Sequence, residues 1–218
     1  MLFRSSAKEF GYNYFAVCDH SKSAFYANGL SEERIFIQSK ELTKVSSENS
    51  LNILQGIEVD ILHSGELDYD SDFMENFDFV VASVHSRFNM SEIEMTNRII
   101  KAIEHPKTNV LGHPTGRLLL SRDSYTININ KIIDACSRNN VAIEINSNPR
   151  RLDLDWRNIY YARDKGCKFS INQDAHSTED IQNIKFGVWI AQKGGVTPSE
   201  VINCYDFEMF NKFIKDKK

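Results

Sequence analysis

The sequence predicts an α/β fold built on a parallel β-sheet, and three observations support this fold class. Short apolar runs rich in Val, Ile and Phe alternate with longer helix-forming stretches along the chain. The 218 residues are 41% hydrophobic, enough for the core of one domain. No repeat and no low-complexity linker divides the chain. Strict alternation implies right-handed crossovers, so the sheet is either open or rolled into a barrel.

Six strands are expected where short runs are rich in branched and aromatic residues, as buried parallel strands are. They cover residues 14–18, 51–62, 77–85, 109–113, 141–147 and 168–174. Helices are expected between them, and the segment before the first strand, 1–15, begins as a helix. The others cover residues 31–48, 90–105, 128–140, 154–166, 177–194 and a closing helix at 198–215. Ser31 is a suitable N-cap for the first of these, and Pro106 ends the second.

Composition narrows the classes of function. A net charge of -4 argues against a general nucleic-acid coat, although a local basic patch remains compatible with it. The four cysteines form no C-x-x-C pair and indicate reduced thiols in the cytoplasm. Nothing resembles a signal peptide, and no apolar run approaches the roughly 18 residues of a membrane span. We therefore expect a cytoplasmic protein with no membrane partner.

Ligand-type side chains gather at the predicted strand ends. Four of the six histidines follow or end a different strand, and they are His20, His85, His113 and His176. Glu58 lies within the second strand, and Asp174 comes two residues before His176. Because the carboxyl ends of parallel strands meet at one side of a sheet or barrel, these side chains should converge there.

A cluster of imidazoles and carboxylates predicts a multi-metal site for Zn, Mn or Fe. Taken singly, each histidine is explained as well by hydrogen bonds to the backbone. Ser-His-Asp chemistry is the alternative catalytic arrangement, but the sequence has no G-x-S-x-G elbow. Two close metal ions joined by a carboxylate can clamp a phosphate and activate a water. Metal-assisted hydrolysis is thus the favoured chemistry.

Six motifs carry a resemblance to a known family. They are VCDHS, GIEVDIL, VASVHS, LGHPTGR, IEINSNPRRLDL and INQDAHS. In this order they resemble the polymerase-and-histidinol-phosphatase (PHP) family over nearly the whole chain. ANGLSEER, HPTGRLL and NPRRLDL are most similar to the PHP domain attached to bacterial family X DNA polymerases, which act in DNA repair. The resemblance implies a distorted (β/α)7 barrel, up to three metal ions, and phosphoester hydrolysis. In the polymerase-linked members it implies 3′–5′ exonuclease or 3′-end processing activity on DNA.

The resemblance also assigns roles by position. It implies that Glu58 bridges two metals and forms with His85 and His113 a complete protein set for one of them. His20 and His176 then belong to the second metal, and Glu58 and Asp174 to the third. Glu58, Asp174 and His176 are the expected catalytic residues.

The chain departs from the family at its start. The family opens with a strand carrying H-x-H, and no H-x-H occurs in these residues. We expect residues 1–218 to be one PHP domain without its first strand, cut from a longer protein with a polymerase domain upstream. A degenerate homologue, or a partner that supplies the strand, is the alternative. Either way, unpaired strand edges and repulsion between Asp174 and Glu58 are expected.

Basic residues follow the metal-bearing strands and predict phosphate contacts. They are Lys22, Arg117, Arg150 and Arg151, with ordinary solvated charge as the alternative for Lys22. Phe25, Tyr26 and Phe88 are the loop aromatics available for base stacking. Three functions remain open: a phosphoesterase for DNA 3′ ends, a small-molecule phosphatase of the histidinol-phosphate type, and a non-catalytic PHP module that docks a partner.

Overall fold

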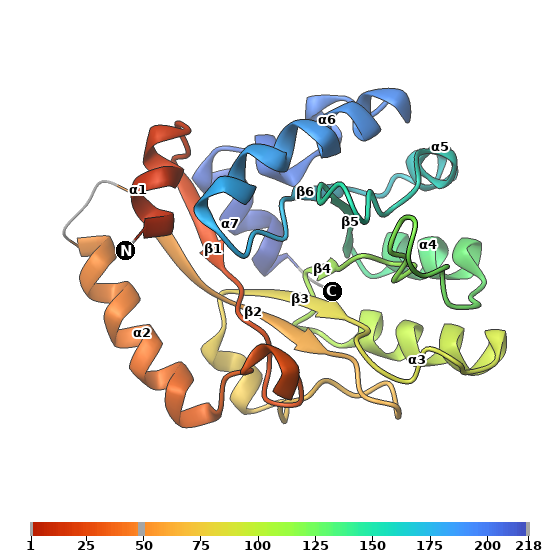
Figure 1. Cartoon of the computed structure of the whole chain (residues 1–218), viewed down its shortest axis with the longest axis horizontal. Coiled ribbons are helices and arrows are strands. Elements are labelled where there is room, and N and C mark those ends of the chain that lie inside the picture. Colours follow the sequence, from red (N-terminus) through yellow and green to blue (C-terminus); the bar gives the residue numbers. More distant parts are fainter. Residues whose placement is uncertain (1, 48–50, 217–218) are drawn as a thin grey trace.

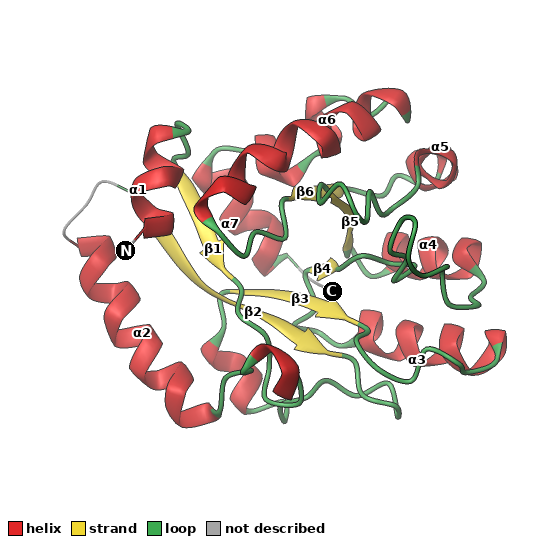
Figure 2. Ribbon diagram, in the orientation of Figure 1, coloured by secondary structure: helices red, strands yellow, loops and turns green. Residues whose placement is uncertain are grey.

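A computed structural model describes residues 2–47 and 51–216 of the chain. Its six strands are all parallel and pair in sequence order, and the sheet curls into a half-barrel (Figures 1 and 2). The strands are β1 (Tyr14–Val17), β2 (Asn52–Asp60), β3 (Phe79–Ser83), β4 (Val110–Leu111), β5 (Ala142–Asn146) and β6 (Phe169–Asn172). Each predicted strand is confirmed, although each is shorter than the apolar run that indicated it. The α/β class is therefore confirmed, in the barrel-like form of the two left open.

In the described part of the chain, seven helices alternate with or flank the strands, and most of them cover the outside of the curl (Figure 1). They are α1 (Leu2–Glu9), α2 (Glu32–Ser47), α3 (Glu92–Glu104), α4 (Ile129–Arg138), α5 (Trp156–Asp164), α6 (Ile184–Lys193) and α7 (Phe207–Lys215). Residue 48 of the helix expected at 31–48 lies outside the described residues. Ser31 does cap α2, since its hydroxyl accepts a hydrogen bond from the Arg34 N–H at 3.4 Å. Within the described part of the chain, no helix combines the length and apolarity needed to cross a membrane.

Two helix predictions were wrong in extent. The helix expected at 177–194 begins as a 3₁₀ segment, η3 (Thr178–Asn183), where the Asp180 carboxylate turns back to accept the Ser177 N–H. The closing helix expected at 198–215 begins only at Phe207, capped by the Asp206 side chain. The residues before it form two short turns, η4 (Pro198–Glu200) and η5 (Ile202–Cys204). They are turns because this segment packs along the edge of the sheet.

Segment 201–203 covers the free edge of β6. Val201 forms a parallel bridge with Phe169, and the Asn203 side chain both donates to the Ile171 carbonyl and accepts from its N–H. The prediction of an unpaired strand edge is therefore wrong for β6, because the Asn203 amide makes the hydrogen bonds that a neighbouring strand would make. At the other end β1 pairs with β2 and with no other strand of the described chain.

The two faces of the sheet have separate cores. Side chains alternate along each strand, so Ile57 and Val59 face the surrounding helices. Leu54, on the opposite face, packs with Val81 and with Phe210 of α7, which lies within the curve of the sheet (Figure 1). Helix α7 thus fills the amino-terminal half of the half-barrel with apolar groups. Polar inner-face side chains are left at the carboxyl ends of the strands, where the functional residues were expected.

A buried cross-link ties the loop after β4 to the loop after β5. The Arg117 guanidinium donates to the Asp155 carboxylate at 2.7 Å, to the Arg151 carbonyl at 2.9 Å and to the Leu152 carbonyl. Asp155 also caps α5 by accepting the Arg157 N–H at 2.9 Å. Hydrogen bonds from Arg157, partly opposed by burial and aided by Arg117, hold the Asp155 pKa well below its usual value. The cross-link fixes both loops that flank the strand ends.

Replacing Asp155 with Asn should lower the free energy of unfolding by about 1–2 kcal/mol at pH 7. Asparagine retains an N-cap acceptor, so the loss reports the ion pairs of Asp155 with Arg117 and Arg157. Because the folded-state pKa is depressed, the stabilisation is present above the unfolded pKa near ~4 and disappears as the pH falls below it. Urea unfolding at pH 7 and at low pH measures this difference. Asp164→Asn, on the exposed end of α5, is the control, and equal stability of Asp155→Asn and wild type at pH 7 would contradict the prediction.

Candidate metal centre

The strand ends bring five of the six predicted ligands into one polar cluster and place the sixth at its rim. Glu58 lies on the inner face of β2, and residue 20 forms a parallel bridge beside it. His85 and His113 each come two residues after the end of β3 and β4. Asp174 and His176 follow β6. The parallel topology therefore explains why residues spread over more than 150 positions meet.

Glu58 and two histidines form a small triangle of ligand atoms. The Glu58 Oε1 atom lies 3.0 Å from His113 Nε2 and 3.3 Å from His85 Nε2, and the two nitrogens are 3.2 Å apart. A tetrahedral metal ion about 2.0 Å from each ligand holds neighbouring ligand atoms about 3.3 Å apart. The triangle has the size of one face of such a tetrahedron. The residues present thus fit a divalent metal, as a nitrogen and carboxylate donor set.

The second oxygen of Glu58 faces another ligand. Glu58 Oε2 lies 3.4 Å from Nδ1 of His20, which is buried and has no hydrogen-bond partner among the described atoms. One carboxylate therefore faces His85 and His113 through one oxygen and His20 through the other. This is the arrangement required of a carboxylate that bridges two metal ions.

Charge in the cluster is concentrated on buried groups. Burial raises the pKa of Glu58, but hydrogen bonds and charge from His113 and His85 outweigh it and hold that pKa well below its usual value. Burial lowers the pKa of His85, yet its bonds to Asp60 and Glu58 raise it to about 9. Burial lowers the pKa of His20, although Glu58 opposes this effect. The lowered pKa of Glu58 favours its ionised form, and the raised pKa of His85 favours a proton that partly balances this charge.

Asp60 is a site residue that sequence reasoning missed. Its Oδ1 atom lies 2.5 Å from His85 Nδ1, and its Oδ2 atom accepts the Ser23 hydroxyl at 2.9 Å. Asp60 thus holds the ring nitrogen of His85 opposite the one that faces Glu58, which fixes the orientation of the ring. Asp60 also belongs to a second possible metal group with His20 and His85. The signal was available, because Glu58 and Asp60 are two apart on one strand and share a face.

Glu144 supports His113 from below and was also missed. Residue 113 has a φ of 23°, an unusual value for a non-glycine residue, and its N–H donates to the Glu144 carboxylate at 2.6 Å. Asn172 donates to the other Glu144 oxygen at 2.8 Å. Burial is the main cause that raises the Glu144 pKa to about 7, with His113 opposing it and Asp174 adding to it. Glu144 thus positions a candidate ligand through its backbone.

Asp174 and His176 lie at the outer side of the cluster. Asp174 accepts hydrogen bonds from Arg151 Nε and from Asn146, both at 3.1 Å, so the expected repulsion with Glu58 is offset within the chain. The His176 side chain is 68% exposed, and its ring centroid is 6.3 Å from that of His20. The structure places this pair beside His20, where the second metal was expected.

The four predicted phosphate-binding cations occupy different environments. Arg151 lies in the cluster beside Asp174, with a side chain 17% exposed. Arg150 is exposed, and Lys22 pairs with Glu32 at 3.1 Å. Arg117 is committed to the cross-link with Asp155. Binding of substrate by these residues stays a prediction, and Arg151 is the one that the fold directs into the cluster.

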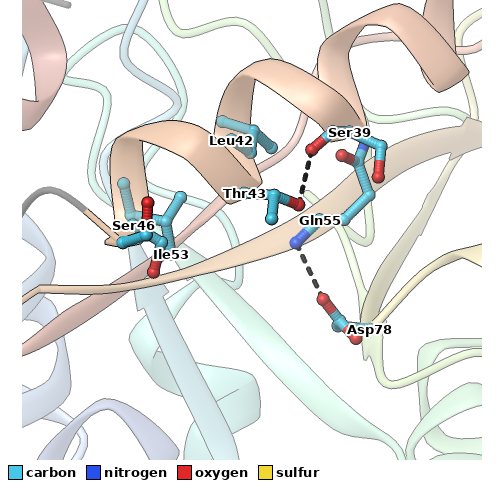
Figure 3. Close-up of a pocket in the computed structure, with 8 residues that line it drawn as sticks. Ser39, Leu42, Thr43, Ser46, Ile53, Gln55 and Asp78 are labelled. Atoms are coloured by element: carbon cyan, nitrogen blue, oxygen red, sulfur yellow. Dashed lines mark hydrogen bonds between the residues drawn. The ribbon is translucent and has the colours of Figure 1, made fainter.

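Hollows elsewhere on the molecule lack this chemistry. A groove of about 420 Å³ lies between α2 and β2, lined mainly by hydroxyl-bearing side chains with Gln55 and Asp78 (Figure 3). Ile53 and Gln55 belong to the helix-facing side of β2, opposite the side that carries Glu58 and Asp60. A second hollow of about 430 Å³ is formed by residues 117–124, in the loop after His113. Among the described residues, the two groups of side chains that could hold a metal ion both lie at the strand ends.

Comparison with known proteins settles the family. No family model matches the chain. It is 39% identical over 206 residues to the DNA polymerase/3′-5′ exonuclease PolX of Bacillus subtilis, covering 94% of this chain and 36% of that protein. It is 30% identical over 178 residues to a probable phosphatase of Thermoanaerobacter sp., covering 70% of that protein. The chain belongs to the PHP family of phosphoesterases. It spans about a third of the length of its PolX relative.

A solved structure agrees with the fold of this PHP chain. Histidinol phosphate phosphatase from Lactococcus lactis, solved with zinc, L-histidinol and phosphate, matches 90% of the chain with a TM-score of 0.58. The two sequences are 15% identical, so this likeness concerns the fold. The ligand triangle at Glu58 is one of the groups of side chains in the described chain that could hold a metal ion.

Replacing Asp60 with Asn should weaken divalent metal binding by about 10- to 100-fold, because His85 loses the carboxylate that orients it. Titration of the metal-free chain with Mn²⁺ or Zn²⁺, followed by calorimetry, measures the affinity directly. Asp123→Asn, which alters an exposed carboxylate in the 117–124 loop, is the control. Equal affinities of Asp60→Asn and wild type would show that Asp60 does not position His85.

Proposed function

We propose that this chain hydrolyses phosphodiesters at DNA 3′ ends, as a 3′–5′ exonuclease or end-processing enzyme that depends on Mn, Zn or Fe. The observation that carries the proposal is the Glu58 carboxylate, which faces His85 and His113 through one oxygen and His20 through the other. The choice of DNA rests on the likeness to PolX over 94% of the chain. A polymerase domain in the same polypeptide and a cytoplasmic setting are part of this proposal.

Glu58, His85 and His113 would hold the first ion, His20 and His176 a second, and Glu58 with Asp174 a third. When bound, such ions polarise a phosphoryl oxygen and lower the pKa of a bound water. The chain's own contribution is to hold the ligands. Asp60 fixes the His85 ring, and Glu144 fixes the backbone of His113. Glu58, Asp174 and His176 would stand nearest to the reacting phosphate.

Arg151 would bind the phosphate. Its Nε donates to Asp174, while its buried Nη1 has no hydrogen-bond partner among the described atoms. A guanidinium with a free N–H beside the ligand cluster is suited to a phosphate oxygen, because charge-assisted hydrogen bonds are stronger than neutral ones. Arg151 would therefore orient the phosphodiester against the metal ligands.

A small-molecule phosphatase is the second candidate function. The relatives named as probable phosphatases, of which the Thermoanaerobacter protein is 30% identical over 70% of its length, favour it. The two functions share the metal centre and differ in what surrounds the phosphate. Parallel assays with a labelled single-stranded oligonucleotide and with histidinol phosphate distinguish them. Shortening of the oligonucleotide from its 3′ end supports the DNA function, and turnover of histidinol phosphate alone would replace it.

Replacing His113 with Ala should lower 3′-end hydrolysis in Mn²⁺ by at least about 100-fold and remove one bound ion, because the ligand triangle at Glu58 is lost. Metal content by mass spectrometry and gel assays of the oligonucleotide measure both effects. His63→Ala is the matched control, since His63 is exposed and belongs to neither group of potential metal ligands found among the described residues. Unchanged metal content in His113→Ala would refute its assignment as a ligand.

Replacing Arg151 with Ala should lower kcat/KM for the oligonucleotide by about 10- to 100-fold, since a charge-assisted hydrogen bond to the phosphate is lost. Arg151→Lys should recover part of this loss, because it keeps the charge without the planar fork. Arg138→Ala, an exposed arginine on α4, is the control. An unchanged kcat/KM in Arg151→Ala would remove Arg151 from the phosphate site.

A further inference from the structure

Two consecutive aromatic residues stand exposed beside the metal centre. Phe25 and Tyr26 lie on the 3₁₀ turn η1 (Phe25–Ala27), which follows His20 by five residues. Phe25 is 88% exposed and Tyr26 is 72% exposed. Single exposed apolar residues are common on protein surfaces, but two adjacent aromatic rings at the rim of a catalytic cluster call for an explanation.

Tyr26 lies against the candidate ligands themselves. Its ring centroid is 5.9 Å from that of His20 and 6.3 Å from that of His85, both in edge-on arrangements. The Tyr26 ring therefore borders the cluster, while most of its side chain remains open to solvent.

The turn that carries these rings is held rigidly from beneath. The Ser23 N–H donates to Asp68 at 2.6 Å, and the Ser23 hydroxyl donates to Asp60 at 2.9 Å. The N–H groups of Ala27 and Gly29 both donate to the Ala24 carbonyl, and Ala24 is buried. Gly29 is required here, because a Cβ atom would come within 1.9 Å of the Ser21 carbonyl oxygen. Rings on such a fixed turn lose little conformational entropy when they bind a ligand.

The proposed phosphoester function limits the classes of ligand that these two rings could bind. A nucleobase is joined to its phosphate through one sugar, so a ring that stacks on the base must stand beside the phosphate site. Tyr26 meets this condition, since it borders the histidines while Arg151 lies in the same cluster. A base paired within a duplex is already stacked, so an unpaired terminal base is the form with a free face to offer. Base–aromatic stacking is also the usual means of binding single strands without sequence preference.

The role of these rings rests on the proposed function. We propose that Tyr26, flanked by Phe25, stacks on the base of the unpaired 3′-terminal nucleotide. This stacking makes the enzyme select esters that carry a base. Phe88 does not share this role. Its ring stacks on Tyr125 with an interplanar angle of 7°, and the Arg122 guanidinium covers it at 4.3 Å. The aromatic turn at Phe25 and Tyr26 is therefore a substrate-binding feature of the rim.

The test compares two oligonucleotides that are identical except at the 3′ end, where one carries thymidine and the other an abasic tetrahydrofuran residue. With the Mn²⁺-loaded chain, kcat/KM for the thymidine substrate should exceed that for the abasic one by about tenfold. Tyr26→Leu should reduce this ratio to near one, and Tyr26→Phe should preserve it, because phenylalanine retains the ring. Phe25→Leu should reduce the ratio less. Ile93→Ala, an exposed apolar side chain on α3, is the control.

Failure of the stacking site is distinguishable from failure of the DNA function. If the wild type shortens both oligonucleotides equally and Tyr26→Leu leaves the ratio unchanged, the stacking site is refuted while the DNA function stands. If neither oligonucleotide is shortened, the DNA function fails, and binding decides the rest. Fluorescence of 2-aminopurine at the 3′ end should then be quenched by the wild type and not by Tyr26→Leu. Absence of quenching by the wild type would overturn the stacking site.

Discussion

The site depends on one largely buried carboxylate, Glu58, that faces three histidines. Its side chain is 13% exposed, and its two oxygens lie within 3.4 Å of nitrogen atoms from three different strand ends. A carboxylate in such a place is costly to desolvate unless positive charge is close to it. The imidazole side chains provide that positive charge when they bind either a proton or a metal ion. This requirement links the fold to metal-dependent chemistry.

The fold meets the requirement by dividing the interior of the half-barrel in two. Helix α7 places Phe210 against Leu54 and Val81, so the lower half is an apolar plug. Four residues after Leu54, on the same inner face of β2 and beyond Gly56, the side chain is Glu58. The polar cluster therefore lies above a packed apolar floor. A rigid floor of this kind helps to hold ligands from β2 and from four loops in a fixed arrangement.

Much of the fold and of the candidate metal centre could be predicted from the sequence. The features that were missed depend on contacts between residues far apart in the chain. All six strands and the gathering of histidines at their ends follow from apolar runs and from the geometry of parallel sheets. The closing helix was predicted to begin too early, because Val201 and Ile202 are apolar but segment 201–203 pairs with the edge of β6. Asp60 and Glu144 were missed because they carry out their roles through other residues. Their partners, the ring of His85 and the backbone N–H of His113, become neighbours only when the sheet curls.

The balance of charge explains why the candidate ligands need supporting residues. Glu58, Asp60 and Asp174 place three carboxylates in a cluster whose nearest permanent cation is Arg151. Although burial lowers the pKa of His85, hydrogen bonds and charge from Asp60 and Glu58 raise it to about 9, so these carboxylates favour a proton on its ring. Metal binding must displace this proton, so His85 serves as a ligand only if its ring remains in place once it is neutral. Asp60 meets that condition, because its bond to Nδ1 persists when Nε2 loses its proton. Orientation of the ligand by a neighbouring carboxylate therefore keeps the ring of His85 in place for a metal ion.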